Sequence, residues 1–265
     1  MTGQITLGVF DSGLGGLTVL RSIIDLAPGA RVVYFGDTGR FPYGPKPSDD
    51  VLKYSLEIAD VLVDRGAQAL VVACNSASAV ALERLEEHVA MPVVGVIDPG
   101  LRAAARATQN GRVGVIGTVG TIASGAYQRA AARLGLGLEL TCAACPGFVE
   151  FVEAGDVDSD QVHVLAERLL ERVRAAGVDT VVLGCTHYPL LARTIGDVMG
   201  RDVVLVSSAD ETAFAVRELL GAAVVTRDTS SRHEFVTSGD VATFRRLGSR
   251  FLGPEVDRVE CHRWS

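Results

Sequence analysis

Long hydrophobic runs are missing from this sequence of 265 residues. No apolar stretch approaches the roughly 18–20 residues that a membrane-spanning helix needs, so no integral membrane segment is expected. The segment 1–10 lacks a basic start followed by a long apolar core, which argues against a secretory signal peptide. We therefore expect a cytoplasmic protein.

The sequence also lacks blocks of like charge and any excess of basic residues. Its formal net charge is −7, with 48% hydrophobic and 22% charged residues, a composition typical of a packed soluble protein. An acidic average argues against a basic nucleic-acid face, and we expect no direct binding to nucleic acids or membranes.

Cysteine is scarce, and its spacing is not that of a metal site. A cytoplasmic location predicts that the five cysteines are reduced thiols, so a disulfide scaffold is not expected. The single Cys-x-x-Cys, Cys142 to Cys145, is accompanied neither by a second such pair nor by a His cluster, either of which could complete a zinc site. We expect no metal site and interpret this pair as core or loop thiols.

What the sequence does contain is a regular alternation of strand and helix patterns. Buried apolar runs are at 5–11, 32–36, 69–74, 92–97, 113–117, 138–143, 180–185 and 203–206. Helical patterns are at 17–27, 48–62, 78–88, 99–107, 127–134, 161–176, 190–199 and 211–220. Such alternation predicts the α/β class with mostly parallel sheets. The loop 37–47 is too long and too particular in composition for a simple connection.

Weak internal symmetry accompanies this order. The segment 7–13 resembles 113–119, an offset of 106, and two cysteine-ended strands are offset by 111. We predict two similar domains, 1–98 and 99–208, related by pseudo-twofold symmetry, with the active site in the cleft between them. The tail, 209–265, is expected to return to the first domain, although a small separate cap also fits its pattern.

The two cysteine-ended strands are the strongest functional signal from the residues alone. The segments 71–76 and 181–187 each run from apolar residues through a cysteine into small polar residues. Parallel sheets bind ligands at the carboxyl ends of their strands. One such cysteine is more often an inert core residue, but a matched pair favours a functional site.

Several chemistries could use two thiols placed in this way. Metal binding lacks further ligands, and a disulfide redox couple between Cys74 and Cys185 is a second choice in the cytoplasm. A thiol near pKa 8.5 is a few per cent thiolate at neutral pH. One thiolate and one thiol could remove a proton from one face of a carbon and deliver one to the other, inverting a stereocentre.

Dinucleotide binding is the rival interpretation of the first turn. Gly13 and Gly15 follow a strand and open a helix, and Asp37 ends the next strand, as in a nicotinamide-cofactor fingerprint. Thr18 stands at the third small position, where it would crowd helix–strand packing. This interpretation also leaves the paired cysteines unexplained.

Four motifs, occurring in order, together resemble the glutamate racemases. They are Asp11-Ser12-Gly13-Leu14-Gly15-Gly16, Asp37-Thr38 with Arg40-Phe41-Pro42-Tyr43-Gly44, Cys74-Asn75-Ser76-Ala77-Ser78 and Gly184-Cys185-Thr186-His187-Tyr188-Pro189. The resemblance extends from about residue 7 to residue 220. It implies a cofactor-independent, two-base racemisation of L-glutamate to D-glutamate for peptidoglycan biosynthesis.

The resemblance also implies the role of individual residues. Cys74 and Cys185 would be the acid/base pair, with Cys74 acting on D-glutamate. Asp11 would assist Cys74, while Glu153 and His187 would assist Cys185. The substrate's carboxylates and ammonium would be held by Asp11, Ser12, Tyr43, Gly44, Asn75, Ser76, Thr118, Thr121, Thr186 and His187.

The sequence departs from the family pattern at a few positions. Ser76 stands where many members have threonine, and Gly147 and Glu150 stand where leucine and proline are more usual. Glu150 therefore competes with Glu153 for the assisting role, which we assign to Glu153 by alignment of the segment.

Simpler roles exist for several of these side chains. Asp11 and Ser12 could cap a helix that begins near Leu14, His187 could be a surface residue, and Tyr43 could be a packed loop aromatic. A racemase of aspartate or a related acid would differ only in pocket size. The family also implies a homodimer and, for some members, an interaction with DNA gyrase, which none of the quoted residues indicates.

Overall fold

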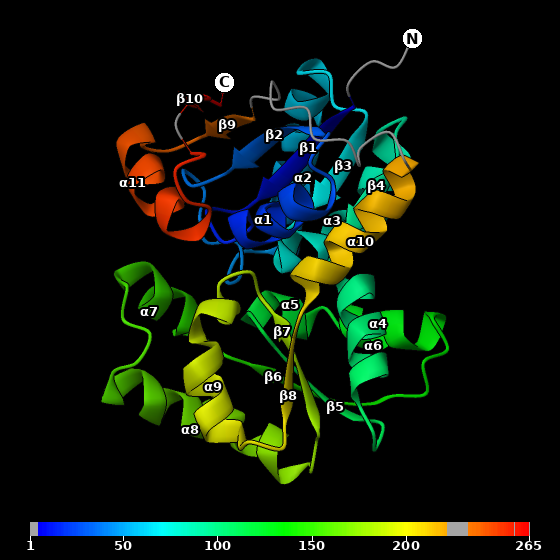
Figure 1. The fold of residues 1–265 in the computed structure, drawn as a ribbon, viewed down its shortest axis with the longest axis vertical. Coiled ribbons are helices and arrows are strands. Elements are labelled where there is room, and N and C mark those ends of the chain that lie inside the picture. Colours follow the sequence, from blue (N-terminus) through cyan, green and yellow to red (C-terminus); the bar gives the residue numbers. More distant parts are fainter. Residues whose placement is uncertain (1–4, 222–232, 257, 265) are drawn as a thin grey trace.

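Two parallel sheets organise the chain in the computed structural model, which describes residues 5–221, 233–256 and 258–264. The larger sheet has the strand order β10-β9-β2-β1-β3-β4, and the smaller has β6-β5-β7-β8. Figure 1 shows the larger sheet above the smaller one. The strands of the larger sheet are β1 (Thr6–Asp11), β2 (Arg31–Gly36), β3 (Ala69–Val72), β4 (Val93–Gly95), β9 (Glu234–Thr237) and β10 (Val259–Cys261). Those of the smaller sheet are β5 (Arg112–Gly117), β6 (Glu139–Ala144), β7 (Thr180–Gly184) and β8 (Val204–Ser207).

Helices connect these strands. Those before β5 are α1 (Leu17–Leu26), α2 (Ser48–Asp64), α3 (Asn75–His88) and α4 (Ile97–Ala107). Those between β5 and β8 are α5 (Val119–Ala123), α6 (Ala126–Arg133), α7 (Phe148–Ala154), α8 (Asp160–Ala175), the 3₁₀ turn η1 (Tyr188–Leu191) and α9 (Ala192–Met199). After β8 come α10 (Ser208–Leu220) and α11 (Val241–Phe251). No helix in the described ranges is long and apolar enough to cross a membrane.

Both faces of each sheet are covered, which explains why the strands are apolar almost throughout. Alternate residues of a strand point to opposite faces, so Leu7 and Val9 pack with α1 and α10, while Phe10 packs with α2 and α3. In the smaller sheet, Val181 faces α8 and α9, and Val182 faces α4 and α6. The predicted α/β class with two parallel sheets is confirmed.

The two halves repeat one topology. The order β2-β1-β3-β4 in the first half matches β6-β5-β7-β8 in the second. The internal packing repeats as well, at Gly8 in β1 and Gly114 in β5. A Cβ on Gly8 would lie 3.0 Å from Ala67 and 3.2 Å from Leu62, and one on Gly114 would lie 2.5 Å from Val173 and 3.5 Å from Val178. Leu62 corresponds to Val173 and Ala67 to Val178, each pair being 111 residues apart in sequence. The equivalent crossover segment therefore packs against the equivalent strand position in both halves.

The helix that follows the fourth strand of each half crosses to the other half. α4 packs against α6, β7 and β8, while α10 packs against α1 and β4, and the two helices contact each other. Beyond α10, β9 pairs with β2 and β10 pairs with β9. The strands of the tail that the structure describes therefore belong to the larger sheet. Residues 222–232, which the predicted tail includes, lie outside the described residues, and the domain boundaries at 98 and 208 stay a prediction.

Several element boundaries differ from the sequence-based expectation. The strand expected at 69–74 ends at Val72, and α3 begins at Asn75, three residues earlier than expected. Cys74 is thus the N-cap of α3 rather than a strand residue. In the same way, α4 begins at Ile97 and shortens the expected strand 92–97 to three residues. The short helix α5 was not expected, because five residues give too little periodicity.

Close packing of α8 on β5 predicts a stability difference between two glycine substitutions. Gly114→Ala places a Cβ 2.5 Å from Val173, and overpacking of this kind should destabilise the protein by about 1–3 kcal/mol. Gly196→Ala, inside α9, meets no atom closer than 3.7 Å and should stabilise the protein by about 0.5–1 kcal/mol. Urea unfolding of both variants is the measurement. A Gly114→Ala protein as stable as the wild type would contradict the packing described here.

Candidate active site

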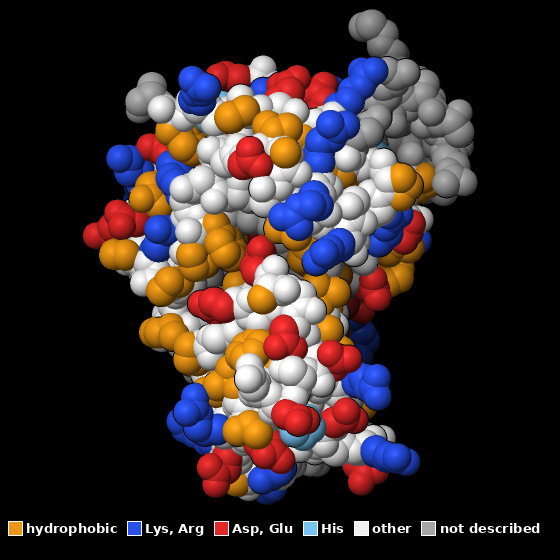
Figure 2. Space-filling model, turned by 90° about the vertical axis from the view of Figure 1, so that its left-hand side faces the viewer, with side chains coloured by type: hydrophobic (Ala, Val, Ile, Leu, Met, Phe, Trp, Pro, Cys, Tyr) orange, Lys and Arg blue, Asp and Glu red, His pale blue; other side chains and the backbone are white. Residues whose placement is uncertain are grey.

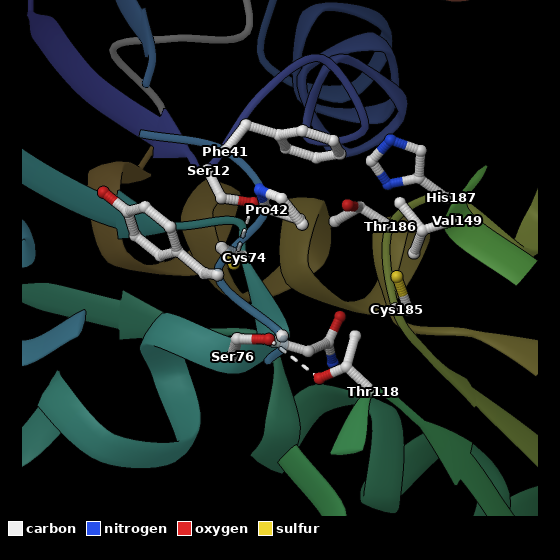
Figure 3. A pocket seen from close by; sticks show the side chains of 13 residues that line it. Ser12, Phe41, Pro42, Cys74, Ser76, Thr118, Val149, Cys185, Thr186 and His187 are labelled. Atoms are coloured by element: carbon white, nitrogen blue, oxygen red, sulfur yellow. Dashed lines mark hydrogen bonds between the residues drawn. The ribbon is translucent and has the colours of Figure 1, made fainter. Parts of the chain in front are cut away.

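A cavity of about 300 Å³, counted together with its opening to solvent, lies where the carboxyl ends of the two sheets face each other. Figure 3 shows Cys74 and Cys185 on opposite sides of it. The cavity is lined by Ser12, Phe41, Pro42, Tyr43, Gly44, Cys74, Asn75, Ser76, Thr118, Val149, Cys185, Thr186 and His187. Cys74 follows β3 and Cys185 follows β7. In each sheet this strand pairs with one side of the first strand of its half (β1 or β5), and the second strand (β2 or β6) pairs with the other side. The cysteines therefore lie where the strand order reverses, which is where open α/β sheets bind ligands.

Ten of the predicted site residues line this cavity directly. The remaining three, Asp11, Thr121 and Glu153, each contact a lining residue. Asp11 accepts a hydrogen bond from the Thr186 hydroxyl, Thr121 lies 3.2 Å from the Ser76 hydroxyl, and Glu153 pairs with His187. Sequence reasoning missed Val149, and it quoted Phe41 and Pro42 only as parts of a motif.

Cys74 is 5% exposed and lies between β3 and the first turn of α3. Its thiol donates a hydrogen bond to the Ser12 hydroxyl at 3.6 Å. Burial and the nearby Asp11 charge raise the pKa of Cys74 to about 12, against the opposing effect of the Ala77 backbone N–H. The protonated thiol is therefore the resting form of this side chain.

Cys185 is 7% exposed and has a different environment. His187 is 2% exposed, and its Nε2 lies 2.8 Å from Glu153 Oε1. Burial alone would lower the pKa of His187, but hydrogen bonds with Cys185 and Glu153 raise it to about 10. A buried imidazolium thus stands beside the second thiol, and His187 is not the surface residue that was considered as an alternative.

The two glutamates of α7 differ in their contacts. Glu153 contacts His187, whereas Glu150 is exposed and lines an adjoining cavity, which shares Pro42, Gly44, Thr118 and Val149 with the first. Of the two, Glu153 is the one with a hydrogen bond to the imidazole.

Two aromatic rings hold the His187 imidazole in place. The Phe41 ring lies 5.9 Å from it, and the Phe251 ring lies 6.1 Å from it edge-on. Phe251 comes from α11 and belongs to the groove between α7 and α11, with Val152, Leu190 and Leu247. Figure 2 looks onto this side of the molecule, where hydrophobic side chains gather at mid-height. No motif drew attention to Phe251, because its contact with His187 arises only in the fold.

Asp11 is completely buried at the end of β1. Its carboxylate accepts hydrogen bonds from the Gly13 backbone N–H at 2.9 Å and from the Thr186 hydroxyl at 3.3 Å. Burial raises the pKa of Asp11, while the His187 cation opposes that shift. The helix α1 begins at Leu17 rather than near Leu14, and Asp11 accepts hydrogen bonds from the Gly13 and Gly16 backbone N–H groups of the turn before it.

Hydroxyl and amide groups occupy the floor of the cavity. Ser76, Thr118 and Thr121 form a cluster with oxygen–oxygen distances of 2.9 to 3.2 Å. Figure 3 draws the bond between Ser76 and Thr118. The Asn75 amide donates to the buried Tyr127 hydroxyl at 2.9 Å, and its Oδ1 is buried without a hydrogen-bond partner in the described structure. That oxygen is an unused acceptor beside the cavity.

The dinucleotide alternative fails on two contacts. A Cβ on Gly15 would lie 2.3 Å from the Thr186 hydroxyl and 2.6 Å from His187 Nδ1, so the glycine turn contacts the second half of the chain rather than a phosphate site. The Asp37 carboxylate is 0% exposed and accepts hydrogen bonds from Arg40, Tyr43, Ser238 and Trp264, which leaves none of it for a ribose.

Tyr43 and Gly44 reach the cavity as part of the loop between β2 and α2. The Tyr43 side chain is 1% exposed, and its hydroxyl donates to Asp37 instead of pointing at the cavity centre. The Gly44 carbonyl accepts a hydrogen bond from the Gly120 backbone N–H at 2.8 Å. This loop therefore joins the two halves at the edge of the cavity.

Comparisons with known proteins agree with this geometry. The family model for Asp/Glu/Hydantoin racemase matches residues 8–216. A glutamate racemase from Geobacter metallireducens is 52% identical over 255 residues, which cover 96% of this chain and 94% of the relative.

The chain belongs to the glutamate racemase family. It is accordingly an enzyme of the isomerase class. The crystal structure of a glutamate racemase isoform from Bacillus anthracis superposes with a TM-score of 0.93 at 39% identity, covering 99% of this chain and 98% of the other. The glutamate racemase of Francisella tularensis, solved in complex with D-glutamate, gives a TM-score of 0.90 at 30% identity, covering 99% and 98%.

Pairing with Glu153 predicts the pH behaviour of His187. Because its pKa of about 10 lies above the ordinary value of 6.5, the hydrogen bonds of His187 with Cys185 and Glu153 together contribute stability that is fully present below about pH 6.5. That contribution is lost as the pH rises through about 10. Glu153→Gln should lower the pKa of His187 and shrink this pH-dependent part of the unfolding free energy. An NMR titration of the imidazole, with urea unfolding at several pH values, measures both.

Glu150→Gln is the matched control, since it removes the same charge from the same helix. It should leave the titration of His187 unchanged. Equal shifts in the two variants would show that a general field, and not the contact with Glu153, sets the protonation of His187.

Proposed function

We propose that this chain catalyses the cofactor-independent, two-base racemisation of L-glutamate to D-glutamate, with Cys74 and Cys185 acting on opposite faces of the α-carbon. The observation that carries the proposal is the pair of buried thiols on opposite sides of one cavity, at equivalent strand ends of two similar halves. A proton acceptor on one face and a donor on the other is the arrangement that inversion requires.

The two thiols have different charged neighbours. The His187 side chain, a cation at neutral pH, hydrogen-bonds with Cys185, while burial and the nearby Asp11 charge keep Cys74 protonated. In the L-to-D direction, the Cys185 thiolate takes the α-proton and the Cys74 thiol delivers its proton to the opposite face. After this step Cys185 is a thiol and Cys74 is a thiolate. The reverse reaction begins from this state, with the Cys74 thiolate taking the α-proton of D-glutamate and the Cys185 thiol delivering a proton to the opposite face.

The cavity walls supply groups for both charged ends of an amino acid. The unused Oδ1 of Asn75 can accept a hydrogen bond from the ammonium. The N-terminus of α3 and the hydroxyl cluster of Ser76, Thr118 and Thr121 suit a carboxylate. Ser12, Thr186 and the backbone of Tyr43 and Gly44 complete the proposed binding set.

The α-carbon is a very weak acid, so its developing negative charge needs stabilisation. Fixed dipoles in a closed cavity do this more strongly than water, because they are already oriented when the charge forms. The backbone N–H groups at the start of α3 and the hydroxyls around the cavity are such dipoles.

Glutamate is the substrate that the family comparison favours. A Francisella tularensis relative was solved with D-glutamate, and that chain is 30% identical over nearly its full length. Aspartate, shorter by one methylene, is the competing substrate to test. A supply of D-glutamate for peptidoglycan in the cytoplasm is the physiological role we propose. A homodimer and an interaction with DNA gyrase stay predictions.

Serine substitutions test the acid/base assignment. Cys74→Ser and Cys185→Ser should each lower kcat by about 10²–10⁴-fold in both directions, because a hydroxyl is a far weaker acid than a thiol. Circular dichroism of L- and D-glutamate solutions without added cofactor follows the reaction, and L-aspartate serves as the alternative substrate.

Cys261→Ser is the matched control, since Cys261 is an exposed thiol outside the cavity. It should retain the wild-type rate within about twofold. Retention of more than a tenth of the wild-type rate by either cavity variant would contradict the assignment.

A further inference from the structure

The segment 262–264 packs against the loop that carries Tyr43 and Gly44, although more than 200 residues separate them in sequence. His262 donates its backbone N–H to the Thr237 carbonyl at 2.7 Å, which extends the edge of the larger sheet. The ring of Trp264 lies 5.4 Å from that of Phe35 in β2. These contacts place the indole at the start of the loop 37–47.

Trp264 contacts two charged groups of this loop. Its indole N–H donates to Asp37 Oδ1 at 3.2 Å. Its ring lies 3.7 Å from the Arg40 guanidinium carbon, and the Tyr54 ring covers the other face of that guanidinium at 4.0 Å. A cation held between two aromatic faces is favourable, and more so when it is partly desolvated. The Arg40 side chain is 15% exposed.

Asp37 transmits this contact to the cavity. The Arg40 Nε donates to Asp37 Oδ2 at 2.7 Å, and the Tyr43 hydroxyl donates to the same carboxylate oxygen. Tyr43 and Gly44 then form one wall of the cavity. A continuous chain of contacts therefore runs from Trp264 through Asp37 to the proposed binding site.

We infer that Trp264 is a positioning residue, which holds the loop 37–47 in its binding-competent form before substrate arrives. The inference rests on the proposed function, because it assigns Tyr43 and Gly44 to the same substrate site. A loop that is ordered only part of the time weakens binding in proportion to its ordered fraction. Once substrate is bound the loop is ordered, so the rate of the bound complex changes little.

This mechanism predicts a change in KM separate from kcat. In Trp264→Ala, a fall of the ordered fraction to about 0.1 raises KM for glutamate about tenfold, while kcat stays within about twofold. Trp264→Phe keeps a ring over Arg40 but lacks the N–H donor to Asp37, and it should show an intermediate KM. Arg263→Ala changes an exposed neighbour and should match the wild type.

Hydrogen exchange followed by mass spectrometry tests the same inference without activity. Peptides that cover residues 37–47 should exchange about tenfold faster in Trp264→Ala, while peptides from β1 and β3 keep wild-type protection. If wild-type protein does not racemise glutamate, the proposed function fails. The hydrogen-exchange measurement then decides the role of Trp264 by itself. If Trp264→Ala does not fold, Trp264→Phe carries both measurements.

Two results would overturn the inference. One is a folded Trp264→Ala protein with wild-type KM and wild-type exchange of the loop. The other is a faster exchange that is uniform over the whole protein, with a loss of kcat at unchanged KM, which would assign Trp264 a general role in stability only.

Discussion

The Asp11 carboxylate is completely buried between the two halves of the molecule, where a charge is tolerated only with partners. The backbone N–H groups of Gly13 and Gly16 come from its own turn, and the Thr186 hydroxyl and the His187 cation come from the opposite half. The site is therefore incomplete in either half alone. Gly15 is part of the same constraint, since a side chain there would collide with Thr186 and His187.

The features that the two halves share place the two cysteines at equivalent positions, and the differences between the halves determine the chemistry of the site. Strand order, the glycine at the middle of the first strand and the cysteine after the third strand are shared. The charged partners are not shared, because an anion stands near Cys74 and a cation beside Cys185. In the proposed mechanism this asymmetry lets one thiol wait protonated while the other accepts a proton.

The sequence alone predicts those features that depend on local pattern. Apolar runs indicate the strands of both halves, and the abrupt change to polar residues after Cys74 and Cys185 indicates the edge where ligands bind. The four quoted motifs contain eleven of the thirteen cavity residues, all but Thr118 and Val149. Features that depend on distant contacts escape such reasoning. Phe251 and Trp264 carry no local signal, and they meet His187 and Asp37 only because α11 and β10 return to the larger sheet. Helix starts such as Asn75 are also missed, since apolar periodicity does not mark a cap formed by a cysteine.

Isotope content at the α-carbon tests the central claim of two bases most directly. L-glutamate is incubated with the wild-type enzyme in D₂O, without added cofactor, and both enantiomers are analysed by mass spectrometry at early conversion. With two bases, the D-glutamate formed carries solvent deuterium, because the proton it receives comes from a thiol that exchanges with solvent. The remaining L-glutamate keeps its hydrogen. D-glutamate that retains the original hydrogen would show that a single base moves the proton between faces, and it would contradict the account.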